Sequence, residues 1–237
     1  MERAVDSPSS RVLTVRALTL RLDARFPFDG HDLRLAVTGA VPDRHLLHGH
    51  DGDSAYTYRL PRVRYFVRRG IPTLAGIDEG LPLLEEMMRR PPQTLRVRSQ
   101  VFRVLGADIE DSVERFGPAI APVEYRFVTP WLALNQENHR RYEQAAAEGR
   151  ADLLARAAVG NLLSSAKGVE VFVRERLAAQ VRVRPFPVRL KEIQLLGFVG
   201  RLVVNFDLPE LWGLGKSVSR GFGIVRRAGP ALRMGRP

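Results

Sequence analysis

The chain of 237 residues contains no cysteine. That absence excludes a disulfide framework, cysteine-bound zinc, iron–sulfur clusters and thiol nucleophiles. No run reaches the ~18 consecutive apolar residues of a membrane span, and residues 1–8 lack the apolar stretch of a signal peptide. We therefore expect a cytoplasmic protein with no membrane partner. Any catalyst here must use histidine, carboxylate, hydroxyl or amine groups, or a metal held without thiolate.

Lysine is also scarce, because only Lys167, Lys191 and Lys216 stand among the 37 basic residues and the rest are arginine. Arginine binds phosphate in bidentate fashion and stacks on bases, which suits RNA or DNA. A GC-rich genome would explain the same bias without any partner. The excess of charge is the stronger observation: the formal net charge is +11, and residues 181–237 hold eleven basic side chains against three acids. This favours a polyanionic partner.

The hydrophobic pattern of the first half predicts strand, helix, strand, strand, helix, strand, over residues 12–22, 31–40, 56–68, 72–76, 81–90 and 94–105. Asp29 or Asp32 can cap the first helix, and Pro91-Pro92 stops the second. This order is the ferredoxin-like βαββαβ unit, which RNA-recognition modules also use.

A second unit is expected to begin near Gly117-Pro118, with a strand over 123–134, helices over 135–147 and 151–166, two long strands within 181–206 and a short strand over 224–227. The predicted fold class is α+β, with two tandem ferredoxin-like domains. Their expected bounds are 11–116, which carries a histidine cluster, and 117–230, which carries a C-terminal glycine-rich loop.

The glycine-rich loop, residues 213–223, packs four glycines, one lysine and one arginine into eleven residues. A P-loop is excluded, because its first glycine would fall at Glu210. An ordinary turn would not need Lys216 and Arg220. Four glycines permit positive φ angles and close approach of backbone amides to a large ligand, so a phosphodiester backbone fits best. The residues expected to bind RNA here are Gly213, Gly215, Lys216, Ser217, Ser219, Arg220, Gly221 and Phe222, together with Arg59 nearer the N-terminus.

Three of the five histidines, His45, His48 and His50, lie within six residues. One interpretation is a metal site in which His48, His50 and Asp51 or Asp53 bind zinc or manganese. The other is acid–base chemistry on RNA, where a base removes the ribose 2′-hydroxyl proton and an acid protonates the 5′ leaving oxygen. Imidazole, with a pKa near ~6.5, can serve both tasks around neutral pH. Such a reaction needs no metal.

The form G-x-G-x(5)-G-x-G before the last strand of two ferredoxin-like halves resembles the repeat-associated RNA-binding (RAMP) superfamily of CRISPR systems. Further segments are similar to one family of that superfamily, the repeat-RNA endoribonucleases of Cas family six. Within this family they resemble the branch that has a His-x-His active site. They are Leu46–His50, Tyr58-Arg59-Leu60-Pro61, Arg64-Tyr65, Gly76–Gly80, Tyr125–Trp131 and Leu134–Asn138. The resemblance covers about residues 12–227. It departs at Leu60, where the family often has tyrosine.

The resemblance implies a metal-independent endoribonuclease that cuts precursor CRISPR RNA within its repeats to give guide RNAs, leaving 2′,3′-cyclic phosphate and 5′-hydroxyl ends. His48 and His50 would be the acid and the base. Tyr56 or Tyr58 would position the scissile phosphate or pack in the strand; Tyr58 is taken as the catalytic candidate. Lys167 or Arg44 would stabilise the phosphorane.

No cofactor and no metal are expected. The expected partner is CRISPR repeat RNA, single-stranded or as a hairpin, with effector-complex subunits or a second copy of the chain as further candidates. Two other functions stay open. One is a non-catalytic RNA-binding RAMP subunit of an effector complex, and the other is a metal-dependent hydrolase.

Overall fold

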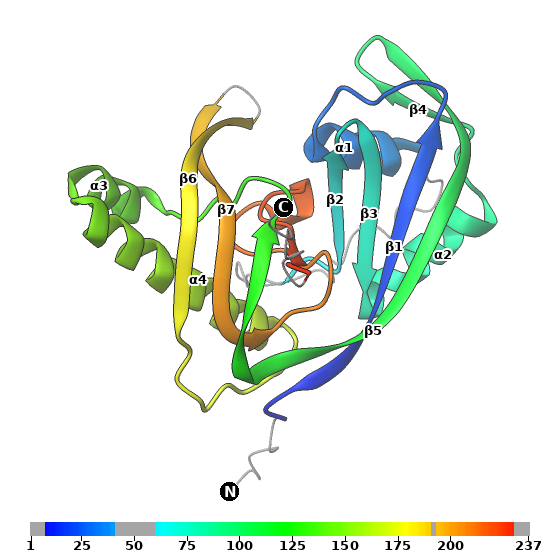
Figure 1. Ribbon diagram of the computed structural model, residues 1–237. Helices are drawn as coiled ribbons and strands as arrows, with labels where there is room; N and C mark the ends of the chain where they lie inside the picture. Colours follow the sequence, from blue (N-terminus) through cyan, green and yellow to red (C-terminus); the bar gives the residue numbers. More distant parts are fainter. Residues whose placement is uncertain (1–7, 41–59, 191–192, 230–237) are drawn as a thin grey trace, which may run out of the picture.

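The computed structural model describes residues 8–40, 60–190 and 193–229. Two halves lie side by side, each built on an antiparallel sheet (Figure 1). The first half contains β1 (Arg11–Leu22), α1 (Gly30–Ala40), β2 (Val63–Arg68), β3 (Ile71–Ile77), α2 (Leu81–Arg89), β4 (Thr94–Val97) and the start of β5 (Gln100–Phe127). The second contains the end of β5, α3 (Gln136–Gln144), α4 (Ala147–Gly168), β6 (Ala179–Leu190), β7 (Ile193–Asp207) and β8 (Val225–Arg227).

Both halves have the same strand order. In the first half the strands run β2-β3-β1-β5, and in the second they run β8-β5-β7-β6. When the four strands of each half are renumbered from 1 in chain order, leaving out β4, the first half reads 2-3-1-4 and the second reads 4-1-3-2, the same order reversed. This is the strand order of the sheet in a βαββαβ unit. The predicted fold class, two tandem ferredoxin-like domains, is confirmed.

β5 belongs to both sheets. Its first part pairs with β1 and its last part with β7 and β8, with a shift of register between Pro118 and Val123. Figure 1 shows the strand running down the first half, bending and rising into the second. Gly117 lies at the bend with a φ of +153°. The chain therefore passes from one sheet to the other without a linker, and the domain boundary between residues 116 and 117 stays a prediction.

The helices of the first half begin and pack as their sequence indicates. Asp29 caps α1, because its Oδ1 accepts from the backbone N–H groups of His31 and Asp32 at 2.8 and 3.0 Å. Leu33 of α1 and Leu84 of α2 are fully buried in the same core. This apolar cluster covers one face of the first sheet.

Two predicted strands have different bounds in the structure. Residues 94–105 do not form one strand, because a turn with Arg98 at a φ of +54° divides them into β4 and the start of β5. The strand predicted over 123–134 is the end of β5, which stops at Phe127. The chain then turns toward Trp131, whose ring stacks on Phe127 at 5.0 Å. Packing of these rings replaces the last part of the expected strand.

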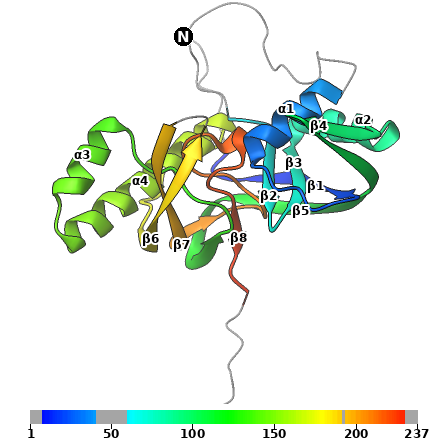
Figure 2. The same cartoon turned by 90° about the horizontal axis from the view of Figure 1, so that it is seen from above.

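The second half departs from a regular βαββαβ unit at one place. Where a second helix would stand between β7 and β8, residues 208–224 contain the glycine-rich loop, 213–223, and within it a short 3-10 turn, Val218–Arg220. α4 packs against β6 on one face of the sheet, and Figure 2 shows the two halves from above. None of the described helices has the length and apolar character to cross a membrane.

Candidate nucleic-acid interface

The histidine cluster falls within residues 41–59, outside the described residues. His45, His48, His50, Tyr58 and Arg59 therefore keep their roles as predictions. The ends of that segment are described. It leaves α1 at Ala40 and returns at Leu60, which is buried in the larger core. Leu60 packs on the end of α4, where a Cβ placed on Gly168 would lie 2.7 Å from the Cβ of Leu60.

The segment that leads from β7 toward the glycine-rich loop is fixed by Tyr125 of β5. Its buried hydroxyl donates to the carbonyl of Phe206 at 3.1 Å and accepts from the N–H of Leu208 at 2.8 Å. Burial raises the pKa of Tyr125 to about 12, so the hydroxyl stays protonated and keeps both bonds. The chain thus leaves β7 in a fixed direction.

The loop closes on itself and on the connection between β5 and α3. The N–H of Leu214 donates to the carbonyl of Gly223 at 3.0 Å, and the N–H of Gly223 donates to Pro130 at 2.8 Å. The N–H of Lys216 donates to the carbonyl of Leu132 at 3.1 Å. These bonds hold the backbone in place before any ligand is present.

The loop also docks on the first half. A Cβ added to Gly221, whose φ is +86°, would overlap the carbonyl oxygen of Tyr65 in β2 and lie 2.9 Å from the Cα of Phe66. On the other side, Arg34 of α1 donates to the hydroxyl of Ser219 at 3.3 Å. The space beside Gly221 is therefore filled by protein. Its lack of a side chain is explained by this contact, and not by close approach of RNA as the sequence suggested.

The other predicted loop residues differ in exposure. Lys216 is exposed, and Ser217, Ser219 and Arg220 are partly exposed. Phe222 is buried in a small cluster with Leu132 and Leu190. The side chains of this loop that can meet a ligand are therefore the polar and basic ones, while the RNA-binding assignment of the loop stays a prediction.

A buried arginine lies beside the loop. The guanidinium of Arg64 in β2 is fully buried and lies 5.2 Å from the ring centroid of Trp212. It has no hydrogen-bond partner among the described residues. Burial, with a smaller effect from Arg62, lowers the pKa of Arg64 to about 10. The guanidinium stays charged at neutral pH. It lies over the face of the Trp212 ring, which attracts a cation.

Four arginines line up across the second sheet. The strand registers place Arg182 of β6 opposite Arg201 of β7, Arg201 opposite Arg126 of β5, and Arg126 opposite Arg226 of β8. Their sequence neighbours, among them Val181, Tyr125, Leu202 and Val225, point to the core that α4 covers, so this arginine row occupies the opposite face. Like charges directly opposite one another destabilise a sheet. Such an arrangement is suited to a polyanion.

The arginine row continues into the first half. A hollow of about 470 Å³ is lined by Arg126 and Arg201 together with Arg68 and Arg69 at the β2–β3 turn. Partial burial lowers the pKa of Arg68, and the charges of Arg69, Arg226 and Arg126 lower it further. Arg201 pairs with Glu124 at 2.6 Å and Arg226 with Glu210 at 3.0 Å. Arg126 and Arg182 have no acidic partner among the described residues.

None of the four arginines of this row was predicted from the sequence to contact RNA, although Arg126 lies within the segment Tyr125–Trp131 that carries the family resemblance. Alternation of valine with arginine at 181–184 was a signal for one exposed strand face, but the register that aligns four strands is not readable from sequence. In the described part of the chain, no three histidine or acidic side chains gather as a metal would require.

The fold and the basic face define a tandem ferredoxin-like protein whose surface suits a polyanion. Residues 12–114 match the family model of the Cas6b N-terminal domain, and residues 119–228 match the Cas6b C-terminal domain. The protein belongs to the Cas6 family.

Individual proteins show the same similarity. An uncharacterized protein of Methanocaldococcus jannaschii is 37% identical over 134 residues, which are 56% of this chain and 91% of that protein. A crystal structure of Cas6b superposes with a TM-score of 0.81 at 28% identity, covering 92% of this chain and all of the other. A crystal structure of the CRISPR RNA processing endoribonuclease Cas6b has a TM-score of 0.71 at 24% identity, with the same coverage of both chains.

Proposed function

We propose that this protein is an endoribonuclease that cuts precursor CRISPR RNA within its repeats and so produces guide RNAs. The observation that carries the proposal is the match of both halves, residues 12–114 and 119–228, to the two Cas6b domains. A structural relative over the same extent is named a CRISPR RNA processing endoribonuclease. The net charge of +11 agrees with a polyanionic substrate.

The arginine row and the loop give the RNA two basic surfaces. Arg126 and Arg182, which have no acidic partner among the described residues, contact phosphates on the sheet face. Lys216 and Arg220 contact the backbone at the loop, which docks between the two halves. These contacts hold the RNA in register without reading its sequence.

Cleavage is assigned to the His-x-His pair, His48 and His50. One imidazole takes the proton of the ribose 2′-hydroxyl, and the 2′-oxygen attacks the adjacent phosphorus. The bond from phosphorus to the 5′-oxygen breaks, and the other imidazole protonates that oxygen. The products are a 2′,3′-cyclic phosphate and a 5′-hydroxyl, and no metal takes part.

Two further residues support this step in the proposal. Tyr58 orients the scissile phosphate. Lys167 stabilises the negative charge of the phosphorane. Its position in the chain agrees with this role, because Lys167 directly precedes Gly168, on which Leu60 packs. Leu60 is the first described residue after the segment that carries His48, His50 and Tyr58.

The test is cleavage of RNA that carries the repeat of a neighbouring CRISPR array. We expect cutting at one site within the repeat in excess EDTA, and no cutting when the 2′-hydroxyl at the cut nucleotide is replaced by hydrogen. Activity that is lost to chelator and restored by zinc would contradict the mechanism, as would a 3′-hydroxyl product. Tight binding without any cutting would indicate a non-catalytic RNA-binding subunit.

A further inference from the structure

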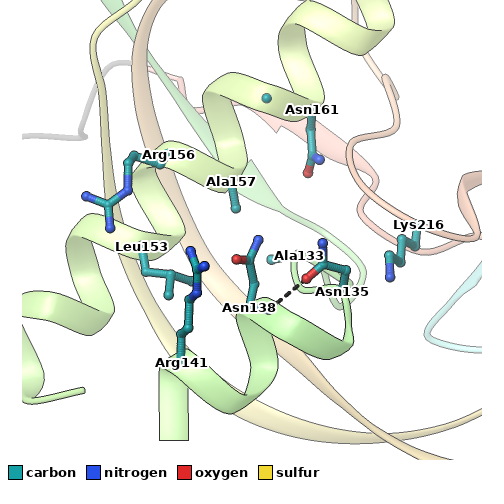
Figure 3. Close-up of a pocket in the computed structure, with 10 residues that line it drawn as sticks. Ala133, Asn135, Asn138, Arg141, Leu153, Arg156, Ala157, Asn161 and Lys216 are labelled. Atoms are coloured by element: carbon teal, nitrogen blue, oxygen red, sulfur yellow. Dashed lines mark hydrogen bonds between the residues drawn. The ribbon is translucent and has the colours of Figure 1, made fainter. Parts of the chain in front are cut away.

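A cavity of about 340 Å³ lies between α3, α4 and the glycine-rich loop. Figure 3 shows Asn138 of α3 and Asn161 of α4 pointing toward one another across it, with Arg141 and Arg156 on one side and Lys216 on the other. None of the residues that line the cavity belongs to the arginine row, and among them only Lys216 was predicted from the sequence to contact RNA.

The side-chain amides of Asn135 and Asn161 present their NH₂ groups, which are hydrogen-bond donors, to the cavity. The Oδ1 of Asn161 accepts from the indole N–H of Trp131 at 3.0 Å, which orients its NH₂ group away from the tryptophan. The Oδ1 of Asn135 accepts from the backbone N–H of Asn138 at 2.7 Å and caps α3, so its NH₂ group also stays available. The side-chain amide of Asn138 makes no bond to the other described residues and can both donate and accept.

The charges in the cavity are positive. Among the residues that the structure describes, three cations line the cavity and no acidic side chain does. Arg141 pairs with Glu137 along α3, whereas Arg156 and Lys216 have no acidic partner in the described ranges. Donors and unpaired cations around one hollow favour an anionic ligand with several acceptor atoms.

The cavity also has an apolar side. Leu153 and Ala157 of α4 line it together with the polar groups. Its volume lies at the small end of ligand cavities, where a single nucleotide fits and a helix or a folded peptide segment does not. A free phosphate ion would leave the apolar side chains of the cavity, Leu153 and Ala157, without a contact.

We propose that this cavity binds one unpaired nucleotide of the RNA substrate. Lys216 and Arg156 contact the phosphates on either side of that nucleotide, Asn138 hydrogen bonds the edge of its base, and Leu153 and Ala157 contact its face. Unpaired bases turned out of the strand are the usual targets of sequence-specific RNA recognition. The inference rests on the proposed function, because it assumes that RNA is the substrate.

Gly160 offers a way to fill the cavity without disturbing the fold. It lines the cavity, and a Cβ added to it would meet no atom within 4 Å. Gly160→Leu should keep or raise the melting temperature, because leucine favours a helix more than glycine does. It should weaken binding of the repeat RNA about tenfold, the typical effect of losing one base contact. The matched control is Gly149→Leu on the same helix, where the Cβ would make an ordinary 3.4 Å contact with Ala145; it should bind like the parent.

A base-removal series identifies the ligand. Repeat RNAs with a single abasic site at each unpaired position should show one position where the parent protein binds about tenfold more weakly. Asn138→Ala should bind unmodified RNA more weakly and show a smaller penalty at that one position, since the hydrogen bond to the base edge is already gone while the contacts of Leu153 and Ala157 with its face remain. A nucleoside monophosphate added at a large excess over the RNA should not displace it.

The outcomes separate the two proposals. If the parent cuts repeat RNA and both Gly160→Leu and Asn138→Ala bind it like the parent, the cavity is not a nucleotide site while the proposed function stands. Equal penalties in parent and Asn138→Ala at every abasic position would also overturn the inference. A nucleoside monophosphate that binds the parent without displacing RNA, and does not bind Gly160→Leu, would show that the cavity serves a soluble ligand and overturn the inference. If the parent binds RNA and does not cut it, the proposed function fails, and the same binding series still tests the cavity. Absence of any RNA binding overturns both.

Discussion

Gly221 of the glycine-rich loop lies directly against the carbonyl oxygen of Tyr65 in β2, so that no Cβ fits between them. The two residues belong to different halves of the molecule. With the bond from Arg34 to Ser219 at 3.3 Å, this contact makes the loop a brace between the two sheets. Lys216 and Arg220 are therefore presented from a backbone that the fold already holds.

The first prediction concerns this brace. Gly221→Ala should destabilise the protein by roughly 2 kcal/mol or more, because a φ of +86° is strained for alanine and the added methyl overlaps backbone. For a chain of this length the melting temperature should fall by roughly 4–8 °C. Thermal unfolding followed by circular dichroism measures it. Gly160→Ala, at an open helical position, is the control and should not lower the melting temperature. Equal melting temperatures for parent and Gly221→Ala would show that the loop is not docked on β2.

The second prediction concerns the arginine row. The double change Arg126→Gln and Arg182→Gln should weaken RNA binding and reduce the slope of log K against log salt by up to about two, since each phosphate contact contributes about 0.7 to 0.9. Stability should stay the same or rise, because like charges opposite one another are removed. Binding titrations over a range of salt concentrations give the slope.

A matched control for the arginine row lies in the first half. Arg96 and Arg103 face solvent on the β4–β5 hairpin. Arg96→Gln with Arg103→Gln removes the same charge and should leave the salt slope near that of the parent. If both double variants reduce the slope equally, the effect is one of net charge and the row is not the contact surface.

The third prediction concerns Arg64, which is buried against Trp212 without a hydrogen-bond partner among the described residues. Arg64→Met keeps the volume and removes a buried charge, so the free energy of unfolding should be unchanged or higher. Arg64→Ala should cost about 2–5 kcal/mol through the cavity it leaves. Urea unfolding of both variants measures this. A loss in Arg64→Met as large as in Arg64→Ala would mean that the guanidinium has a partner it needs.

Much of the fold could be predicted from the sequence, because local signals are strong there. Asp29 before α1 and the apolar spacing of α2 are typical of helix starts and buried helix faces, and both predictions are confirmed. The continuity of β5 over Gln100–Phe127 was missed, because its first and last parts belong to two sheets and only their partner strands show that residues 106–122 are extended.

Less of the candidate site than of the fold could be predicted from the sequence. The glycine-rich loop was recognised, but the reason for Gly221 lies in Tyr65, far away in the chain. Arg126 and Arg226 become neighbours only through strand register. Asn138 and Asn161 meet only because α3 and α4 pack together. Such long-range relationships depend on tertiary packing, which no local pattern encodes.

The central claim is that His48 and His50 perform the proton transfers of RNA cleavage, and single-turnover cleavage of repeat RNA tests it most directly. His48→Ala and His50→Ala should each bind the RNA about as tightly as the parent and cut it ~10²- to 10⁴-fold more slowly, and the double variant should be little worse than the slower single one. His139→Ala is the control, since His139 lies 3.3 Å from Glu143 within α3, and it should cut normally. Parental cutting rates in both cluster variants would place the catalytic groups elsewhere, and a parallel loss of binding and cutting would show that the histidines hold RNA and transfer no proton.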